Sequence, residues 1–72
     1  MTQNDTILRH LEQHGEITPL DALRLYGIMR LGARIYDLKE KGYIIGRTLD
    51  RGTKSNGEPT HWARYVLLGK EM

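Results

Sequence analysis

The chain has 72 residues, of which 39% are hydrophobic, and it contains one Trp and no Phe. A domain of this size buries only about 60% of the surface that its unfolded chain exposes. The core must therefore be small, and little apolar mass is left to line the deep substrate cavity that an independent enzyme needs. The formal net charge of +2 permits a nucleic-acid partner without requiring one.

The absence of cysteine excludes a disulfide framework, a thiolate nucleophile and a Cys-based zinc site, and it fits a reducing compartment. The first residues lack the basic and apolar regions of an export signal, and no stretch approaches the roughly 18 apolar residues of a membrane-spanning helix. We therefore expect a cytoplasmic protein with no membrane partner, folded as a single domain over residues 1–72.

A first helix is predicted from the N-terminus to about Gly15. Thr2 or Asn4 can cap it with a side-chain oxygen, and Asp5 lies in the first turn, where the helix dipole favours a carboxylate. Its apolar residues are Ile7, Leu8 and Leu11.

His10 and His14 lie one helical turn apart, which is the spacing of two metal ligands on one face. A zinc site needs a third protein ligand, and nothing in the sequence brings His61, the remaining histidine, to the first helix. We therefore interpret His10 and His14 as solvent-facing side chains on the polar side of the helix, and we expect no metal site.

Glu16–Thr18 is long enough only for an edge bridge in a small sheet. Thr18 can also cap the next helix, with Pro19 at the first helical position and Asp21 completing a capping box. Gly27 supplies the positive φ that ends this helix. The apolar stripe that we expect it to bury comprises Leu20, Ala22, Leu23 and Tyr26.

A third helix is predicted over about residues 29–41, after a tight turn, and it stops at Gly42. Its apolar residues recur at spacings of four and three, which is the pattern of one buried helical face. These residues are Leu31, Ile35 and Leu38.

Beyond Gly42 the pattern becomes extended, and Tyr43–Leu49 and Trp62–Leu68 are predicted to pair as a hairpin. The segment between them, Asp50–Thr60, is expected to be a long, polar and mobile loop. Asn56-Gly57 in this loop is a strong turn dipeptide, and Pro59 cannot donate a ladder hydrogen bond. We expect residues 69–72 to be a frayed end.

Both faces of the last strand are apolar, because Tyr65 and Leu67 alternate with Val66 and Leu68. We expect Tyr65 and Leu67 to be buried, since the other register would turn Arg64 inward without a partner, at a cost of several kcal/mol. Trp62 is expected to cover the core rather than to stack on a base.

Helix, short strand, helix, turn, helix and hairpin is the order of a winged helix-turn-helix, an α+β fold of three helices plus a C-terminal β-hairpin wing. The run Gly27–Leu38, followed by Lys41–Ile44, resembles the recognition-helix segment of small winged helix-turn-helix DNA-binding domains of bacteriophage and prophage type. The resemblance spans roughly Ile7 to Leu67 and is densest from Leu31 to Ile44. It implies a transcriptional regulator or a recombination accessory factor.

The third helix would act as the recognition helix, which enters the major groove. Gly32 and Ala33 would let its backbone approach the groove floor, although tight packing on the preceding helix would equally explain Gly32. Arg30 and Arg34 lie one turn apart and could each contact guanine or phosphate bidentately.

Asp37, three residues after Arg34, gives both side chains an alternative role. Arg34 would alternatively pair with Asp37 on a solvated face. Asp37 itself would accept from cytosine or, preferably, hold an arginine in position. The plausible phosphate contacts are Arg24, Tyr36, Lys39 and Lys41.

The wing, over about residues 50–60, would lie on the DNA backbone or in the minor groove. Its alternative role is that of a solvated hairpin tip. The candidate residues are Arg51, Lys54, Ser55 and Asn56, flanked on the strands by Arg47 and Arg64.

These observations predict sequence-specific binding of double-stranded DNA without a cofactor and without enzymatic activity. We expect a monomer in solution, or a dimer that forms on DNA through the first helix. The alternative is a winged-helix protein–protein interaction module that does not bind DNA and uses the same exposed helix. An exposed apolar patch of several hundred Å² over the recognition helix and wing would favour that alternative.

Overall fold

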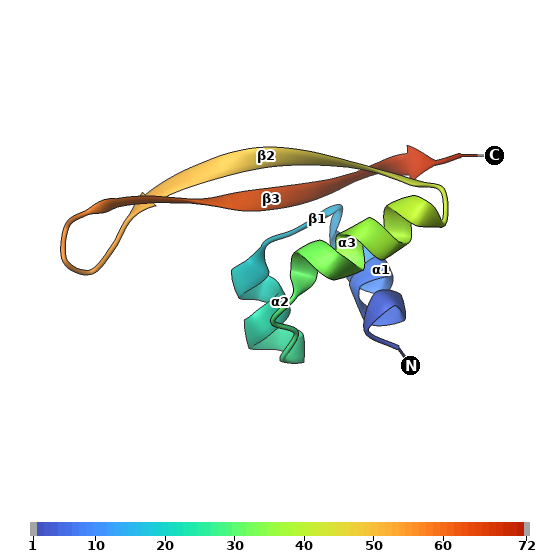
Figure 1. The fold of residues 1–72 in the computed structure, drawn as a ribbon, viewed down its shortest axis with the longest axis horizontal. Helices are drawn as coiled ribbons and strands as arrows, with labels where there is room; N and C mark the ends of the chain where they lie inside the picture. Colours follow the sequence, from blue (N-terminus) through green and yellow to red (C-terminus); the bar gives the residue numbers. More distant parts are fainter. Residues whose placement is uncertain (1, 72) are drawn as a thin grey trace.

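The structure, a computed structural model, describes residues 2–71. Three helices form one layer against a three-stranded antiparallel sheet, and the β2–β3 hairpin projects beyond the helices at one end (Figure 1). The predicted α+β architecture of three helices and a C-terminal hairpin is confirmed. The elements are α1 (Gln3–His14), β1 (Glu16–Ile17), α2 (Pro19–Tyr26), α3 (Leu31–Glu40), β2 (Tyr43–Thr53) and β3 (Pro59–Lys70).

Local capping chemistry sets the bounds of α1 and α2. The Thr2 hydroxyl accepts from the Asp5 amide and the Asp5 carboxylate accepts from the Thr2 amide, so Thr2 rather than Asn4 caps α1. The same reciprocal box joins Thr18 and Asp21 at the start of α2. Each helix ends at a left-handed glycine, at φ 83° and 67° respectively, which is the conformation that glycine adopts without steric cost.

Helix α3 begins two residues later than predicted. The buried Ile28 side chain anchors the turn after α2, and its amide donates to the carbonyl of Ala22. Arg30 is the N-cap residue of α3 and has no side-chain capping bond. Met29 and Arg30 therefore precede the helix, and the recognition helix is shorter than the predicted range of about 29–41.

The core lies where α1, α3 and the sheet meet. The predicted burial of Ile7, Leu11 and the α3 face is confirmed, and Tyr65 and Leu67 of β3 pack against the core as predicted. The buried apolar residues are Ile7, Leu11, Ile17, Ala22, Ile28, Leu31, Ile35, Leu38 and Ile45.

Helix α2 departs from its predicted stripe, because Ala22 is its only buried residue. Leu20, Leu23 and Tyr26 are exposed. The helix approaches the rest of the protein along a narrow seam at the small Ala22 side chain, so its large apolar side chains lie outside the core. The predicted burial of these three side chains was wrong.

His10 was also predicted wrongly, since it is buried rather than solvent-facing. Its Nδ1 atom lies 2.7 Å from the hydroxyl of Tyr26, and its ring lies 4.5 Å from that of His14 between centroids. The contact with α2 covers this part of α1, whereas His14 is exposed as predicted.

Strand β3 is the central strand, in the order β1–β3–β2. Glu16 pairs with Val66 and Ile17 with Tyr65, which confirms the predicted edge bridge. Arg64 does not turn inward unpaired. Its guanidinium pairs with the carboxylates of Asp50 on β2 and Glu16 on β1, so it joins all three strands.

The hairpin is longer than predicted, and residues 50–53, 59 and 60 belong to its strands rather than to a loop. Only a tight turn remains at residues 54–58, where the Lys54 amide donates to the Glu58 carbonyl at 2.7 Å. Gly57 has φ 89°, as the predicted Asn56-Gly57 turn requires. The Asn56 side chain accepts from the Glu58 amide at 3.0 Å.

The predicted fraying of the C-terminal end was wrong for residues 69–71. Lys70 pairs with Tyr43 and places its Nζ atom 4.9 Å from the tyrosine ring centroid. The Glu71 amide donates to the Gly42 carbonyl at 2.7 Å. Residue 72 lies outside the described residues.

The described residues measure 45 × 23 × 20 Å, and the projecting hairpin accounts for the long dimension (Figure 1). None of the helices described here is long and apolar enough to cross a membrane.

Candidate nucleic-acid interface

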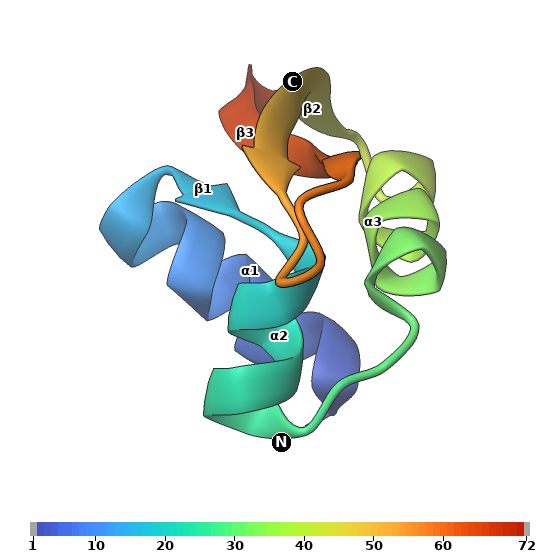
Figure 2. The same ribbon diagram turned by 90° about the vertical axis from the view of Figure 1, so that its left-hand side faces the viewer.

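Helix α3 holds its open face outward because Leu31, Ile35 and Leu38 fix the opposite face in the core. Figure 2 shows α3 at the side of the molecule, with one flank free of neighbouring elements. Gly32 and Tyr36 are exposed, and Ala33 is half-buried. The helix thus offers small side chains near its start and one phenol a turn later, which permits close approach to a partner.

Gly32 is not required by packing. A Cβ atom at this position would have only the Tyr65 hydroxyl within 4 Å, at 3.8 Å, which is an ordinary van der Waals distance. The structure therefore gives no support to tight packing on α2 as the reason for glycine here.

Arg34 lies at the border of the open face, between α3 and the start of α1. Its Nη2 atom lies 3.2 Å from Oδ2 of Asp37, and Nη1 donates to Oε1 of Gln3 at 3.4 Å. Its Nε atom is buried without a hydrogen-bond partner. The pairing of Arg34 with Asp37 is thus present, so Asp37 holds an arginine in position.

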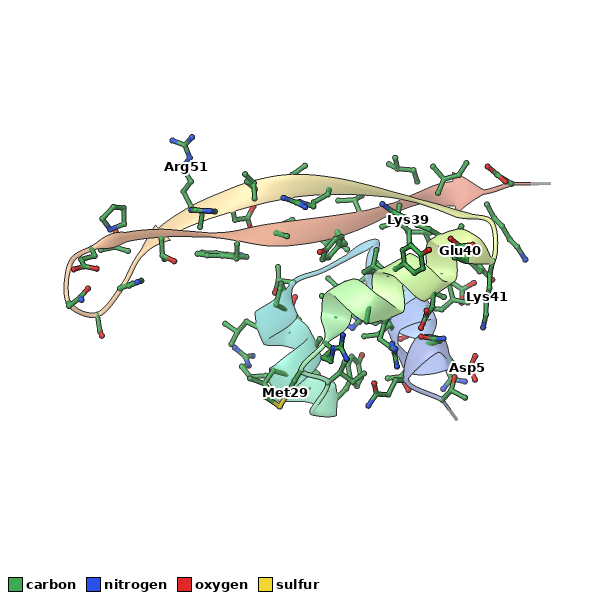
Figure 3. All side chains as sticks on the ribbon, viewed as in Figure 1. Asp5, Met29, Lys39, Glu40, Lys41 and Arg51 are labelled. Carbon is green, nitrogen blue, oxygen red and sulfur yellow. The ribbon has the colours of Figure 1, made fainter. Side chains whose placement is uncertain are left out.

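Basic residues border the C-terminal part of α3 (Figure 3). Lys39 extends toward the hairpin, whereas Lys41 lies at the end of α3, on the same side of the molecule as Asp5. Hydrogen bonds from Thr2 are the main cause of the lowered pKa of Asp5, and the charge of Lys41 adds to it. Glu40 is exposed beside these lysines, so the α3 surface carries both signs of charge.

Arg47 and Arg51 are exposed on β2, the strand that follows α3. Arg51 leaves the hairpin on the side away from the helices (Figure 3). At the tip, Lys54 lies 4.0 Å from the Glu58 carboxylate, and Asn56 uses its carbonyl oxygen in the turn. Arg64 is paired with the carboxylates of Asp50 and Glu16, and the hydrogen bond that its guanidinium donates to Asp50 is the main cause of the lowered pKa of Asp50.

Ion pairing divides the basic residues into two groups. Arg34, Lys54 and Arg64 have a carboxylate within 4.0 Å. In the described part of the chain, the remaining basic residues have no such partner. Those on or beside α3 and β2 are Arg30, Lys39, Lys41, Arg47 and Arg51, and those elsewhere are Arg9, Arg24 and Lys70.

The histidines do not assemble into a metal site. Within residues 2–71, no group of three His, Cys, Asp or Glu side chains is placed to hold a metal ion. His61 is exposed on β3, whereas His10 contacts Tyr26.

Sequence reasoning missed an apolar groove of about 650 Å³ between α2 and the hairpin. The signal was present as the apolar stripe of α2, which was expected to be buried. Trp62 was expected to cover the core, but it lies outside the core cluster and lines this groove. The other lining residues are Thr18, Pro19, Leu20, Asp21, Leu23, Met29 and Arg64.

Comparison with known proteins agrees with this geometry. The family model described as "Winged helix-turn-helix domain" matches residues 2–70. No significant match was found among curated proteins or solved structures.

Proposed function

The chain belongs to the winged helix-turn-helix domain family, and from this premise we propose that it binds double-stranded DNA in a sequence-specific manner. Helix α3 enters the major groove, and the β2–β3 hairpin lies along the adjacent backbone or minor groove. By its resemblance to domains of bacteriophage and prophage type, the protein serves as a transcriptional regulator or a recombination accessory factor.

The observation that carries the proposal is the distribution of unpaired positive charge. Arg64 of β3 is neutralised within the protein by the carboxylates of Asp50 and Glu16. Arg30, Lys39, Arg47 and Arg51 have no carboxylate within 4.0 Å in the described residues, and they lie on or beside α3 and β2, the two elements that a winged helix presents to DNA. Phosphates supply the missing anions, and their contacts position the protein on the duplex.

The open face of α3 contacts the base edges. Gly32 and Ala33 let the helix lie deep in the groove, and Tyr36 contacts the sugar–phosphate wall or a base edge. Arg30 reaches the groove from the start of the helix. Arg34, oriented by Asp37, forms a bidentate contact with guanine when the groove replaces Gln3 as its neighbour.

The hairpin supplies contacts that do not depend on sequence. Arg47 and Arg51 contact phosphates from β2, and Lys54 and Asn56 do so from the tip. Since Lys54 lies at the limit of ion-pair distance from Glu58, an exposed pair of this kind is weak and gives way to a phosphate.

Selection from a random duplex library by electrophoretic mobility shift tests the proposal. We expect the bound fraction to converge on one motif, and the selected duplex to bind at least about a thousandfold more tightly than a scrambled duplex of equal length. Equal binding to all duplexes would contradict base reading. Absence of binding at low salt, where phosphate contacts are strongest, would contradict DNA binding altogether.

A further inference from the structure

A second surface, formed by α2 and the base of the hairpin, carries large apolar side chains that no other residue within 2–71 covers. This α2–hairpin face comprises Pro19, Leu20, Leu23, Met29 and Trp62, which line one continuous groove. Leu20 is 59% exposed and Met29 is 84% exposed. Helix α2, which forms one side of the groove, lies at the end of the molecule where the hairpin projects past the helices (Figure 1).

The polar groups around this groove are already satisfied. Thr18 and Asp21 bond each other through the capping box, and Arg64 is held by Asp50 and Glu16. A phosphate or another small anion would have to displace these partners. The groove therefore suits apolar side chains of a protein rather than a charged ligand.

Trp62 is held in place for such a contact. A Cβ atom on Gly52 would lie 2.9 Å from both Cη2 and Cζ3 of the indole, so only glycine at this position leaves room for the ring beside the β2 backbone. Trp62 also lines the groove. An aromatic side chain that is already ordered loses little conformational entropy on binding, which is typical of residues that dominate interfaces.

The size of this face is large for so small a protein. Leu20, Leu23 and Met29 are 59%, 49% and 84% exposed, on a molecule whose accessible surface is only 5233 Å². A stable interface buries about 800 Å² on each partner, with an apolar centre and a polar rim. The α2–hairpin face supplies such a centre, and the neighbouring polar side chains of α2 complete the area.

We propose that this face binds a second copy of the same chain in a two-fold symmetric homodimer. Leu20 and Leu23 form the α2 wall of the groove, so a two-fold axis can place this wall of each copy in the groove of the other. A surface that contains both shapes is self-complementary, as an isologous interface requires.

The charges of α2 match this arrangement. Asp21 lies in the first turn and Arg24 in the last turn. A two-fold axis perpendicular to α2 makes the two helices antiparallel, so Asp21 of each copy lies beside Arg24 of the other. Arg24 has no carboxylate within 4.0 Å in residues 2–71, and the second copy provides one. This dimer forms without DNA and through α2, whereas the sequence suggested dimerisation on DNA through α1.

Sedimentation equilibrium of the full chain without DNA, from about 1 to 300 μM, tests the proposal directly. We expect a reversible monomer–dimer equilibrium in this range. Leu20→Glu and Met29→Glu should each weaken the dimer at least tenfold. Leu68→Glu is the matched control, because Leu68 is 67% exposed on β3 but does not line the groove, and it should change the dimer dissociation constant less than threefold.

Two charge-reversal variants distinguish the effect of a lost interface contact from the effect of a changed net charge. Arg24→Glu should weaken the dimer at least tenfold, whereas Arg9→Glu, which makes the same change on the exposed surface of α1, should change it less than threefold. Because the chain has no cysteine, single-cysteine variants test geometry. Leu23→Cys, which lies close to its symmetry mate in this antiparallel arrangement and is 49% exposed, should form a disulfide-linked dimer under mild oxidation much faster than Leu68→Cys.

Three results would overturn the proposal. The first is a monomer at every concentration, and the second is a dimer that Leu68→Glu disrupts while Leu20→Glu and Met29→Glu do not. The third is equal cross-linking of the two cysteine variants. Circular dichroism confirms that each variant is folded, and since all these measurements omit DNA, they are independent of the proposed DNA binding.

Discussion

Nδ1 of His10 lies 2.7 Å from Oη of Tyr26, and this pair joins α1 to α2. His10 is only 6% exposed. Burial is the main cause of its lowered pKa, and the charge of His14 lowers the pKa further, against smaller opposing effects of Asp21 and the Glu16 backbone. The folded protein therefore prefers the neutral imidazole.

This preference predicts a loss of stability in mild acid. Below the unfolded-state pKa of about 6.5, the unfolded chain binds a proton at His10 more readily than the folded chain, so the free energy of unfolding falls as the pH decreases. The loss is complete below the folded-state pKa. Thermal unfolding should show a lower midpoint at pH 5 than at pH 7.5.

Two variants assign the effect to His10. His10→Gln keeps a side chain able to bond Tyr26 but cannot titrate, so its midpoint should fall less over this range. His61→Gln, at an exposed site, should behave as the unmodified protein does. Parallel curves for His10→Gln and the unmodified protein would show that another group is responsible.

Replacement of Arg34 should distinguish base reading from phosphate contact. Arg34→Ala should cost about 1 to 3 kcal/mol of binding on the selected duplex and much less on random DNA, because a bidentate base contact is lost only where that base is present. Fluorescence anisotropy with both duplexes measures the difference. An equal loss on both would assign Arg34 to the backbone.

The double variant Arg51→Ala and Lys54→Ala should behave differently. Both side chains are exposed on the hairpin, and their loss should weaken binding to all duplexes by a similar factor. Specificity, measured as the affinity ratio of selected to random duplex, should stay within twofold. A changed ratio would mean that the hairpin also reads sequence.

The unpaired cations of α3 and β2 predict a marked dependence on salt. Contact with four to six phosphates gives a slope of about −4 to −5 for log affinity against log salt on B-DNA. Arg51→Ala with Lys54→Ala should flatten this slope by about one unit for each charge removed. A slope near zero would contradict the assignment of these side chains to phosphates.

Gly52→Ala should displace the indole that lies on it. The added methyl would approach two ring carbons of Trp62 to 2.9 Å, so the ring must swing away at a cost of about 1 kcal/mol. Since Trp62 is the only tryptophan, its fluorescence should shift to longer wavelength. Gly69→Ala is the control, because a Cβ there has no neighbour within 4 Å, and unchanged emission in both variants would contradict the placement of the ring.

What could be predicted from sequence is mostly local. The two capping boxes and the glycine stops depend on residues three or four apart, so Thr2, Asp5, Thr18 and Asp21 identify the helix starts directly. The buried face of α3 follows from its period. These local rules, together with the order of elements, were sufficient for the fold.

Contacts between residues distant in sequence explain what was missed. Arg64 donates a hydrogen bond to Glu16, which is 48 positions away in the sequence, and His10 contacts the hydroxyl of Tyr26, which is 16 positions away. Periodicity identified the apolar stripe of α2, but it does not show whether another element covers that stripe. For the same reason, the extension of the hairpin to the contact between Gly52 and Trp62 could not be predicted from β-propensity alone.

The central place of β3 in the sheet has a consequence for the order of events during synthesis. β1 and β2 do not pair with each other, and each gains its ladder partner only from β3. The carbonyl of Gly15, which directly precedes β1, accepts from the amide of Leu67. β1 can therefore be fixed in the sheet only after a segment about fifty positions later is available. On the ribosome, the helices can form as they emerge, but β1 and β2 remain two open edges until β3 has left the exit tunnel and inserts between them.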